Sequence, residues 1–348
     1  MIGARLALAA SAQLPGALQE PAEAPPLRLV DRKLGVMGTE LELEVLGTDL
    51  VALEAVLDAA ESEIRRVEDL MTDWRPSPLT RLNDAAGKGP QEVPAELAEL
   101  IARSLAIGEL TGGAFDVTYA GAGKLWDFKA DPPVVPDAAA IRAALANVDY
   151  RRVRVDLEAS TVDLPAGMRL GLGGIAKGYG VDRAMAVFLE HGIEHGMVSA
   201  GGDLKVLGRK FGELWTIAVR HPRDRERVLA TLPVSNTCVM TSGDYERFFD
   251  LDGVRYHHIL DPRTGRPATG CMSATVVAQD AAFADALATA MCVMGPDQGL
   301  ALIESLPRVE ALLVSMDGRT LSSSGLRGDA GARPEAPGSD SGPGSGSR

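Results

Sequence analysis

The sequence predicts an α+β fold for one large globular region. Two periodicities support this: Glu40–Val45 alternates charged and apolar residues as a half-buried strand does, and Leu50–Leu70 carries apolar residues at helical spacing. After Val153, strand-like and helix-like runs follow one another without the regular alternation of a doubly wound parallel sheet. We therefore expect mixed or antiparallel sheets flanked by helices.

Further helices are expected along the chain. Apolar spacing predicts one over Leu97–Leu110, which ends at the stop signal Thr111–Gly113. A proline-rich loop then leads into a short helix over Asp137–Ala146. Two more are predicted, over Lys177–His191 and from about Ala282 to Met294. Strand-like runs are found at Trp215–Val219, Val254–Leu260 and Ala274–Ala278.

Composition excludes some classes of function. The chain has 348 residues, 46% of them hydrophobic, and can bury a sizeable core. Its net charge of -13 argues against a nucleic-acid partner, because phosphate backbones are bound through clustered lysine and arginine. The cluster Arg151, Arg152 and Arg154 alternates with valines, as on the solvated face of a strand. No run reaches the roughly 20 apolar residues of a membrane-spanning helix.

The two ends of the chain differ from its middle. Residues 1–27 are predicted to be a signal-like or flexible segment: Arg5 precedes a short apolar run, and Ala10–Ala12 resembles a signal-peptidase site. Residues 328–348 are mostly Gly, Ser and Pro, which predicts a disordered tail. The domain is expected over 28–327, in a protein exported to the periplasm or cell envelope, with a cytoplasmic location as the alternative.

The three cysteines do not indicate a metal or redox site. Cys238, Cys271 and Cys292 are far apart and lack the spacing of a zinc site. Each sits beside Val or Met, so we expect buried, unreactive thiols.

The glycine-rich run Gly171–Tyr179 predicts a nucleotide site. Small residues let a backbone approach phosphate, and Lys177 can neutralise phosphate charge. Gly171, Gly173 and Ala176 also match the weak G-x-G-x-x-G/A pattern, so the run alone leaves a Rossmann dehydrogenase open.

Two oxygen-bearing residues lie one helical turn apart in an apolar segment. Asp285 and Thr289 would share a helix face and together suit Mg²⁺, which prefers oxygen ligands. The alternative is a solvated aspartate and a threonine bonded to its own backbone. The apolar neighbours favour a buried carboxylate, which needs a partner.

A strand with two histidines runs into a turn at Asp261–Gly265. Alternation places His257 and His258 on opposite faces, so one should face inward, where a histidine near neutral pKa can act as a general base. A packed or solvated histidine is the alternative. Trp74 and Phe115, in loops with glycine, proline and acidic residues, are candidates to stack on a planar ligand such as a flavin, or else belong to the core.

Taken together, these segments resemble the ApbE family, the FAD:protein FMN transferases, which attach FMN from FAD to a threonine of a target protein and release AMP. The resemblance covers about Gly35 to Gly295 and implies an α+β roll. The matching segments, in the family's order, are Met37–Thr39, Trp74–Asn83, Gly113–Asp116, Gly171–Asp182, Ser199–Asp203, Thr241–Tyr245, His258–Pro267 and Ala284–Gly295.

The resemblance assigns roles to individual residues. Mg²⁺ would be held by the side chains of Asp285 and Thr289 and by the carbonyl of Gly174. Lys177 would lie near the pyrophosphate, and His258 would take the proton of the incoming threonine hydroxyl. The residues expected to contact FAD are Met37, Trp74, Ala114, Phe115, Asp116, Gly171, Lys177 and Leu260.

Three departures from the family pattern bear on activity. Gly171 stands where the family commonly has aspartate, Trp74 stands where tyrosine is common, and the loop Arg75–Pro78 is one residue short. Ala288 also stands where some members have a further acid. Two other functions therefore stay open: an FAD pyrophosphatase that yields free FMN and AMP, and a non-catalytic FAD-binding protein. The partner of a transferase would be an acceptor flavoprotein with a target threonine, such as a subunit of a membrane redox complex.

Overall fold

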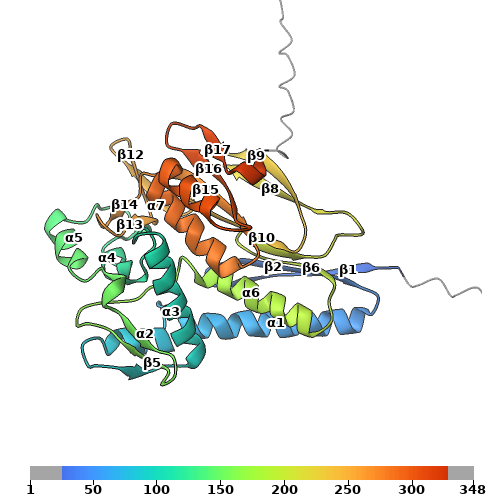
Figure 1. Cartoon of the computed structure of the whole chain (residues 1–348), viewed down its shortest axis with the longest axis horizontal. Helices are drawn as coiled ribbons and strands as arrows, with labels where there is room; N and C mark the ends of the chain where they lie inside the picture. Colours follow the sequence, from blue (N-terminus) through green and yellow to red (C-terminus); the bar gives the residue numbers. More distant parts are fainter. Residues whose placement is uncertain (1–25, 328–348) are drawn as a thin grey trace, which may run out of the picture.

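An antiparallel sheet of eight strands forms the centre of the computed structural model, which describes residues 26–327 (Figure 1). The strands lie in the order β1-β2-β6-β7-β10-β15-β16-β17, and every neighbouring pair is antiparallel. Their bounds are β1 Arg28–Val36, β2 Thr39–Gly47, β6 His195–Ala200, β7 Asp203–Leu207, β10 Thr237–Gly243, β15 Cys271–Ala278, β16 Glu310–Ser315 and β17 Thr320–Ser322. The predicted α+β class is confirmed, and a doubly wound parallel sheet is excluded.

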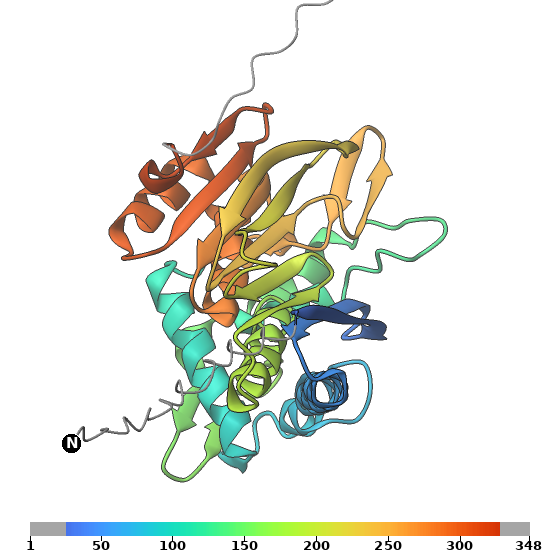
Figure 2. The same cartoon turned by 90° about the vertical axis from the view of Figure 1, so that its right-hand side faces the viewer.

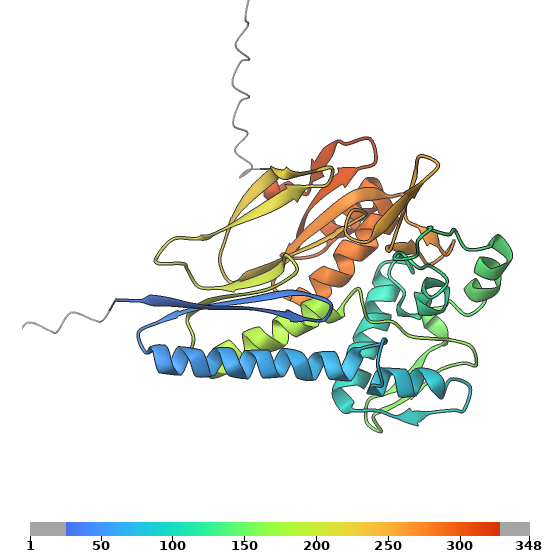
Figure 3. The ribbon, with the colours of Figure 1, turned by 180° about the vertical axis from the view of Figure 1, so that it is seen from behind.

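Three long helices, α1, α6 and α7, lie side by side on one face of this sheet (Figure 1, Figure 3). α3 packs against α7 at one end of the layer. The alternation of β2 and β10 explains the arrangement, because their buried residues point in turn toward the helices and toward the opposite face. The helices are α1 Leu50–Met71, α2 Pro78–Asp84, α3 Ala95–Leu110, α4 Ala120–Gly123, α5 Ala138–Leu145, α6 Ala176–Glu190 and α7 Ala281–Ser305.

The opposite face of the sheet is partly covered by a hairpin of β8 and β9 (Figure 2). Trp215 and Ile217 of β8 pack there against Val206 and Val239 of the sheet. Within residues 26–327 the remaining strands form this hairpin and three further small sheets. Their strands are β3 Gln91–Glu92, β4 Arg154–Asp156, β5 Thr161–Asp163, β8 Trp215–His221, β9 Asp224–Val234, β11 Phe248–Leu251, β12 Val254–His257, β13 Leu260–Asp261 and β14 Arg266–Pro267.

The first long helix follows directly from local sequence. The Asp49 side chain caps it by accepting hydrogen bonds from the backbone N–H groups of Val51 and Ala52 at 3.0 and 3.2 Å. Its buried residues recur at helical spacing and face the sheet and α6. The helix ends at Thr72, so the next residues, which include Trp74, form a loop at its carboxyl end.

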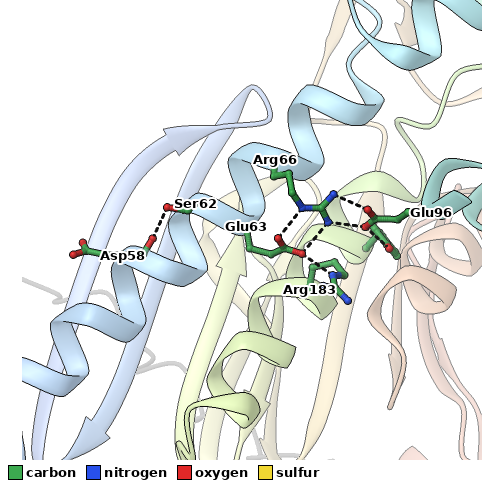
Figure 4. A network of polar contacts seen from close by, with 7 residues as sticks. Asp58, Ser62, Glu63, Arg66, Glu96 and Arg183 are labelled. Carbon is green, nitrogen blue, oxygen red and sulfur yellow. Dashed lines mark hydrogen bonds and ion pairs between the residues drawn. The ribbon is translucent and has the colours of Figure 1, made fainter. Parts of the chain in front are cut away.

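A network of charged side chains ties α1, α3 and α6 together (Figure 4). Arg66 of α1 donates to Glu63 on its own helix and to Glu96 of α3, and Arg183 of α6 donates to Glu63 at 2.7 Å. The hydrogen bond from Arg66, followed by that from Arg183, lowers the pKa of Glu63 to about 2. Tyr179 of α6 adds a 2.6 Å hydrogen bond to Glu96. These contacts hold the first turns of α6 against two other helices.

Most predicted elements are confirmed, and three expectations need correction. The strand predicted over Val254–Leu260 is broken, because β12 pairs with β11 only as far as His257 and a bend at His258 precedes β13. The residues Tyr150–Arg152 form a 3₁₀ turn, and only Arg154 of the arginine cluster lies in a strand, although all three arginines are exposed as expected. α7 runs past Met294 to Ser305 with a kink at Gly295, whose φ is 78°.

Some expectations concern residues outside the described range. The signal-like segment before Pro26 and the Gly/Ser/Pro tail at 328–348 lie outside residues 26–327. Within that range, α7 is the one helix long and apolar enough to cross a membrane by length and composition, and 56% of its most apolar window is buried inside the protein, as in a core helix. Cys238, Cys271 and Cys292 are buried free thiols, as expected.

Candidate active site

A cavity of about 500 Å³ opens where the ends of the long helices meet the sheet and its loops. It is lined by the turn between β1 and β2, the loop after α1, the glycine-rich run before α6, the end of β10, the link between β12 and β13, and one face of α7. Of the residues predicted from the sequence, those that line it are Met37, Trp74, Ala114, Phe115, Asp116, Gly174, Lys177, His258, Leu260, Asp285 and Thr289.

Asp285 and Thr289 form one wall of the cavity. Both lie on the same face of α7, one turn apart. Asp285 is 2% exposed, and Thr289 Oγ1 lies 3.1 Å from Ser242 Oγ of β10. The alternative of a solvated aspartate is therefore wrong, and the threonine has a partner on the neighbouring strand.

The carboxylate of Asp285 also holds α6 in place. Its Oδ2 accepts a 3.0 Å hydrogen bond from the backbone N–H of Gly178, and its Oδ1 accepts none within residues 26–327. Burial raises the pKa of Asp285, while Lys177 and the Gly178 N–H act in the opposite direction. A carboxylate at the cavity wall with one oxygen left without a donor fits a bound cation.

The glycine-rich run brings the backbone close to this wall. A Cβ on Gly174 would lie 3.3 Å from Thr289 Oγ1, so the backbone at Gly174 and the hydroxyl of Thr289 are neighbours. At Gly178 the fit is tighter, since a Cβ there would stand 2.2 Å from the carbonyl oxygen of Ala281. Glycine is therefore required at 178 for α6 and α7 to meet.

The donor set here is oxygen only. Within the part of the chain that the structure describes, no three His, Cys, Asp or Glu side chains cluster as metal ligands. Asp285, Thr289 and the backbone at Gly174 instead offer one carboxylate, one hydroxyl and one carbonyl. Such a mixed set suits Mg²⁺, which usually keeps several waters and binds substrate phosphates in addition to one or two carboxylates.

Lys177 faces the cavity from the first turn of α6. Its ammonium forms an ion pair with Asp203, which is buried and also accepts a 2.7 Å hydrogen bond from the backbone N–H of Thr241. The Lys177 side chain keeps 33% of its surface exposed. The pair therefore fixes the lysine while leaving it in reach of an anion in the cavity.

The two histidines have separate places, as expected, although the strand expected to carry both ends at His257. His257 is buried, and its Nε2 donates to the carbonyl of Ala268 at 2.9 Å, so it serves the fold. His258 lines the cavity, held by a 3.0 Å hydrogen bond from its backbone N–H to the carbonyl of Arg247. Its Nδ1 is buried without a partner in the described structure. Burial, followed by the charge of Arg247, lowers the pKa of His258 to about 4. The ring is therefore neutral at neutral pH, and it is a weaker base than the near-neutral histidine expected from the sequence.

Apolar and aromatic side chains form the other walls. Phe115 and Leu260 are buried, while Trp74 is 63% exposed at the cavity. Met37 sits at the turn between β1 and β2 with a φ of 53°, and its N–H donates to Glu68 at 2.9 Å. These surfaces suit a planar ring that is stacked on one side and open on the other.

Two predicted residues have roles that spacing alone does not reveal. Asp116 lines the cavity, but its carboxylate accepts hydrogen bonds from the N–H and hydroxyl of Thr118 and from the N–H of Tyr150, so it stabilises this loop. Gly171 is not among the lining residues, and its N–H donates to the carbonyl of Val117 at 2.8 Å.

The structure adds lining residues that the sequence reasoning missed. Arg247 and Tyr119 line the cavity, and Arg247 has no ion-pair partner within residues 26–327. Asp203 and Ser242 complete the contacts of Lys177 and Thr289. Asp203 and Ser242 lie in the motif segments Ser199–Asp203 and Thr241–Tyr245, but only the fold shows which side chains they contact.

Comparison with known proteins gives the family. The model of the ApbE family matches residues 37–313 of this chain. The chain belongs to the ApbE family. A protein of Treponema pallidum (strain Nichols) named FAD:protein FMN transferase is 36% identical over 310 residues, which cover 84% of this chain and 86% of that protein. A protein of the same name from Klebsiella pneumoniae (strain 342) is 34% identical over 284 residues, covering 80% and 87%.

Solved structures of ApbE proteins have the same fold. The ApbE protein of Thermotoga maritima matches with a TM-score of 0.80 and 35% identity, covering 87% of this chain and 99% of that one. The flavin transferase ApbE of Vibrio cholerae matches with a TM-score of 0.77 and 30% identity, covering 87% and 99%. The resemblance drawn from the motifs is thus confirmed for the family and for its α+β fold.

Proposed function

We propose that this chain is a Mg²⁺-dependent FAD:protein FMN transferase. It joins the FMN phosphate of FAD to the hydroxyl of a threonine in a target flavoprotein and releases AMP. The observation that carries the proposal is the convergence of Asp285, Thr289, Lys177 and His258 on one cavity of about 500 Å³. Membership of the ApbE family and relatives named FAD:protein FMN transferase support the flavin-transfer chemistry.

The wall residues fit a hard divalent cation. Asp285 and Thr289 would hold Mg²⁺ together with the Gly174 carbonyl, and the carboxylate supplies the negative charge that the ion needs. Bound there, Mg²⁺ would stabilise negative charge on the pyrophosphate oxygens. Asp285 keeps a second task, because its hydrogen bond to the N–H of Gly178 fixes the start of α6 and hence Lys177.

Two cations of the chain itself face the substrate. Lys177 is held by Asp203, and Arg247 has no such carboxylate within the described residues, so Arg247 carries the less compensated charge. Both would bind phosphate oxygens of FAD and hold the phosphorus in position for attack. Phosphoryl transfer depends mainly on such positioning and charge stabilisation.

His258 lines the cavity in the unprotonated state that a proton acceptor for the threonine hydroxyl needs. Its ring is neutral at neutral pH, because burial and Arg247 lower its pKa to about 4. In the proposed step the threonine oxygen forms a bond to the FMN phosphorus while the bond from that phosphorus to the bridging oxygen breaks. The electron pair and that oxygen leave with AMP, and the threonine proton goes to His258.

One incubation separates the candidate activities. The protein is mixed with FAD, Mg²⁺ and a threonine-bearing flavoprotein acceptor, and covalent flavin on the denatured acceptor is measured together with AMP. The proposal predicts both products in equal amounts, and no labelling of a threonine-to-alanine acceptor. AMP without an acceptor and without labelling would instead indicate an FAD pyrophosphatase. Tight FAD binding with neither product would indicate a binding protein.

Export remains part of the proposal. The signal-like composition of residues 1–27 supports a periplasmic or cell-envelope location. The mass of the mature protein isolated from cells tests it, since export predicts that the segment near Ala12 has been removed, whereas an intact amino terminus in the cytoplasmic fraction contradicts it.

A further inference from the structure

We propose that the hydroxyl of Tyr119 is a binding group for FAD and takes the place of a side chain at position 171. This rests on the proposed function, because FAD is the ligand that the cavity is taken to hold. Gly171 opens the glycine-rich run but has no side chain and does not line the cavity. The structure shows what fills the space that this glycine leaves.

No larger side chain fits at position 171 in this chain. A Cβ there would lie 2.9 Å from Ala120 Cβ, which is closer than two such carbons approach each other, and 3.5 Å from Cε1 of the Tyr119 ring. Ala120 is buried at the start of α4 and cannot move aside freely. The side chains of Tyr119 and Ala120 therefore occupy the space beside Gly171, and only glycine fits at position 171 next to them.

The Tyr119 hydroxyl lies where it can meet a ligand on the glycine-rich run. It would be 3.7 Å from a Cβ on Gly171 and 3.6 Å from one on Gly173. Tyr119 and Gly173 both line the cavity, whereas Gly171 does not. The next residue, Gly174, adjoins Thr289, so a ligand lying along the run would touch the proposed cation site and the tyrosine hydroxyl together.

The tyrosine ring is held while its hydroxyl stays available. The ring packs at the edge of the cluster formed by Trp126, Ile141 and Leu260, and a Cβ on Gly123 would lie 3.3 Å from its Cε2. The hydroxyl makes no hydrogen bond to protein within residues 26–327. Burial raises the pKa of Tyr119, so the group stays protonated at neutral pH and can donate to an oxygen or nitrogen of the nucleotide.

The first test is FAD binding by a Tyr119→Phe variant, measured in Mg²⁺ without any acceptor protein. Loss of one neutral hydrogen bond predicts a Kd for FAD about fivefold higher than that of wild type, with an unchanged melting temperature of the ligand-free protein. Tyr256→Phe is the matched control, because Tyr256 packs in the same aromatic cluster but does not line the cavity. Wild-type affinity in Tyr119→Phe, or an equal loss in Tyr256→Phe, overturns the proposal.

A second variant tests whether a polar side chain at position 171 can replace the Tyr119 hydroxyl in binding FAD. In the Tyr119→Phe background, Ala120→Gly removes the obstructing carbon and Gly171→Asp then supplies a polar side chain. We expect this triple variant to bind FAD within about twofold of wild type, as the return of one hydrogen bond requires. A folded triple variant that binds FAD as weakly as Tyr119→Phe contradicts the proposal that a side chain at position 171 and the Tyr119 hydroxyl can replace each other.

The outcome is separable from that of the proposed function. If wild type binds FAD and the Tyr119 variants behave as expected but no FMN reaches an acceptor, the transferase proposal fails and the binding role of Tyr119 stands. If wild type transfers FMN and Tyr119→Phe binds FAD normally, the transferase proposal stands and the binding role of Tyr119 fails.

Discussion

Replacing Asp285 by asparagine separates the role of its charge from its role in packing. Asparagine keeps the size of the side chain, and its carbonyl oxygen can still accept the 3.0 Å hydrogen bond from the N–H of Gly178. Burial raises the pKa of Asp285 above its ordinary value of 3.8. The stability contributed by this group is therefore present below pH 3.8 and is lost as pH rises through the raised pKa. At pH 7 we expect the ligand-free variant to melt at or above the wild-type temperature.

The cost of Asp285→Asn appears as a weaker affinity for the cation. Removing even an indirect partner of a metal ligand costs about 10- to 100-fold in affinity, so removing a charged ligand is expected to cost about 100-fold or more. At a Mg²⁺ concentration of about 100 times the wild-type Kd, binding stabilises wild type by about 2.7 kcal/mol and a variant 100-fold weaker by about 0.4 kcal/mol. That difference corresponds to about 5 °C in melting temperature for a domain of this size.

The assay is thermal unfolding with FAD present, with and without Mg²⁺. Asp280→Asn is the matched control, since Asp280 caps α7 and pairs with Arg103 but does not line the cavity. We expect Mg²⁺ to raise the melting temperature of wild type and Asp280→Asn by several degrees, and that of Asp285→Asn by about 1 °C or less. An equal rise in Asp285→Asn would refute the assignment of this carboxylate to the cation.

Three further predictions concern the same region. His258→Gln should lower the FMN-transfer rate about 100-fold or more while leaving the Kd for FAD within about twofold. Because the pKa of His258 is lowered to about 4, the free energy of unfolding of wild type should fall by about 3 kcal/mol between pH 6.5 and pH 4. The fall should be smaller in the variant, which denaturant unfolding at the two pH values checks. Gly178→Ala should lower the free energy of unfolding by about 3 kcal/mol or more, because its Cβ would stand 2.2 Å from the carbonyl oxygen of Ala281; a variant as stable as wild type in denaturant would show that α6 and α7 can separate at little cost. Arg247→Ala should lower kcat/KM for FAD about 10-fold, and Arg247→Lys should recover part of that loss. Arg255→Ala is the control without effect, because Arg255 pairs with Asp250 outside the cavity. Equal kinetics in all three variants would exclude a role for Arg247 in binding phosphate.

Local sequence was enough to predict the elements that place the site. The one-turn spacing of Asp285 and Thr289 predicted a shared helix face, and the apolar neighbours predicted a buried carboxylate. Both are confirmed, and the structure adds that this face lines the cavity. The two histidines were predicted to diverge, and His258 is the one that reaches the cavity. The shared face of Asp285 and Thr289 depends on the helix period, which can be read from a few neighbouring residues.

Contacts between distant segments could not be predicted in this way. The partner of Lys177 is Asp203 on β7, and nothing in the spacing of the two residues indicates that pair. The break of the predicted strand at His258 depends on where β11 stops pairing with β12. The place of Tyr119 beside Gly171 depends on how the loop before α4 packs against the glycine-rich run. Each of these is set by tertiary packing rather than by local pattern.

The most direct measurement of the central claim is the mass of a flavoprotein acceptor after incubation with this protein, FAD and Mg²⁺. The account predicts that the acceptor threonine gains one FMN, that one AMP appears for each FMN transferred, and that Asp285→Asn gives neither product. An acceptor of unchanged mass beside wild-type protein that has bound FAD, or full labelling by Asp285→Asn, would contradict it.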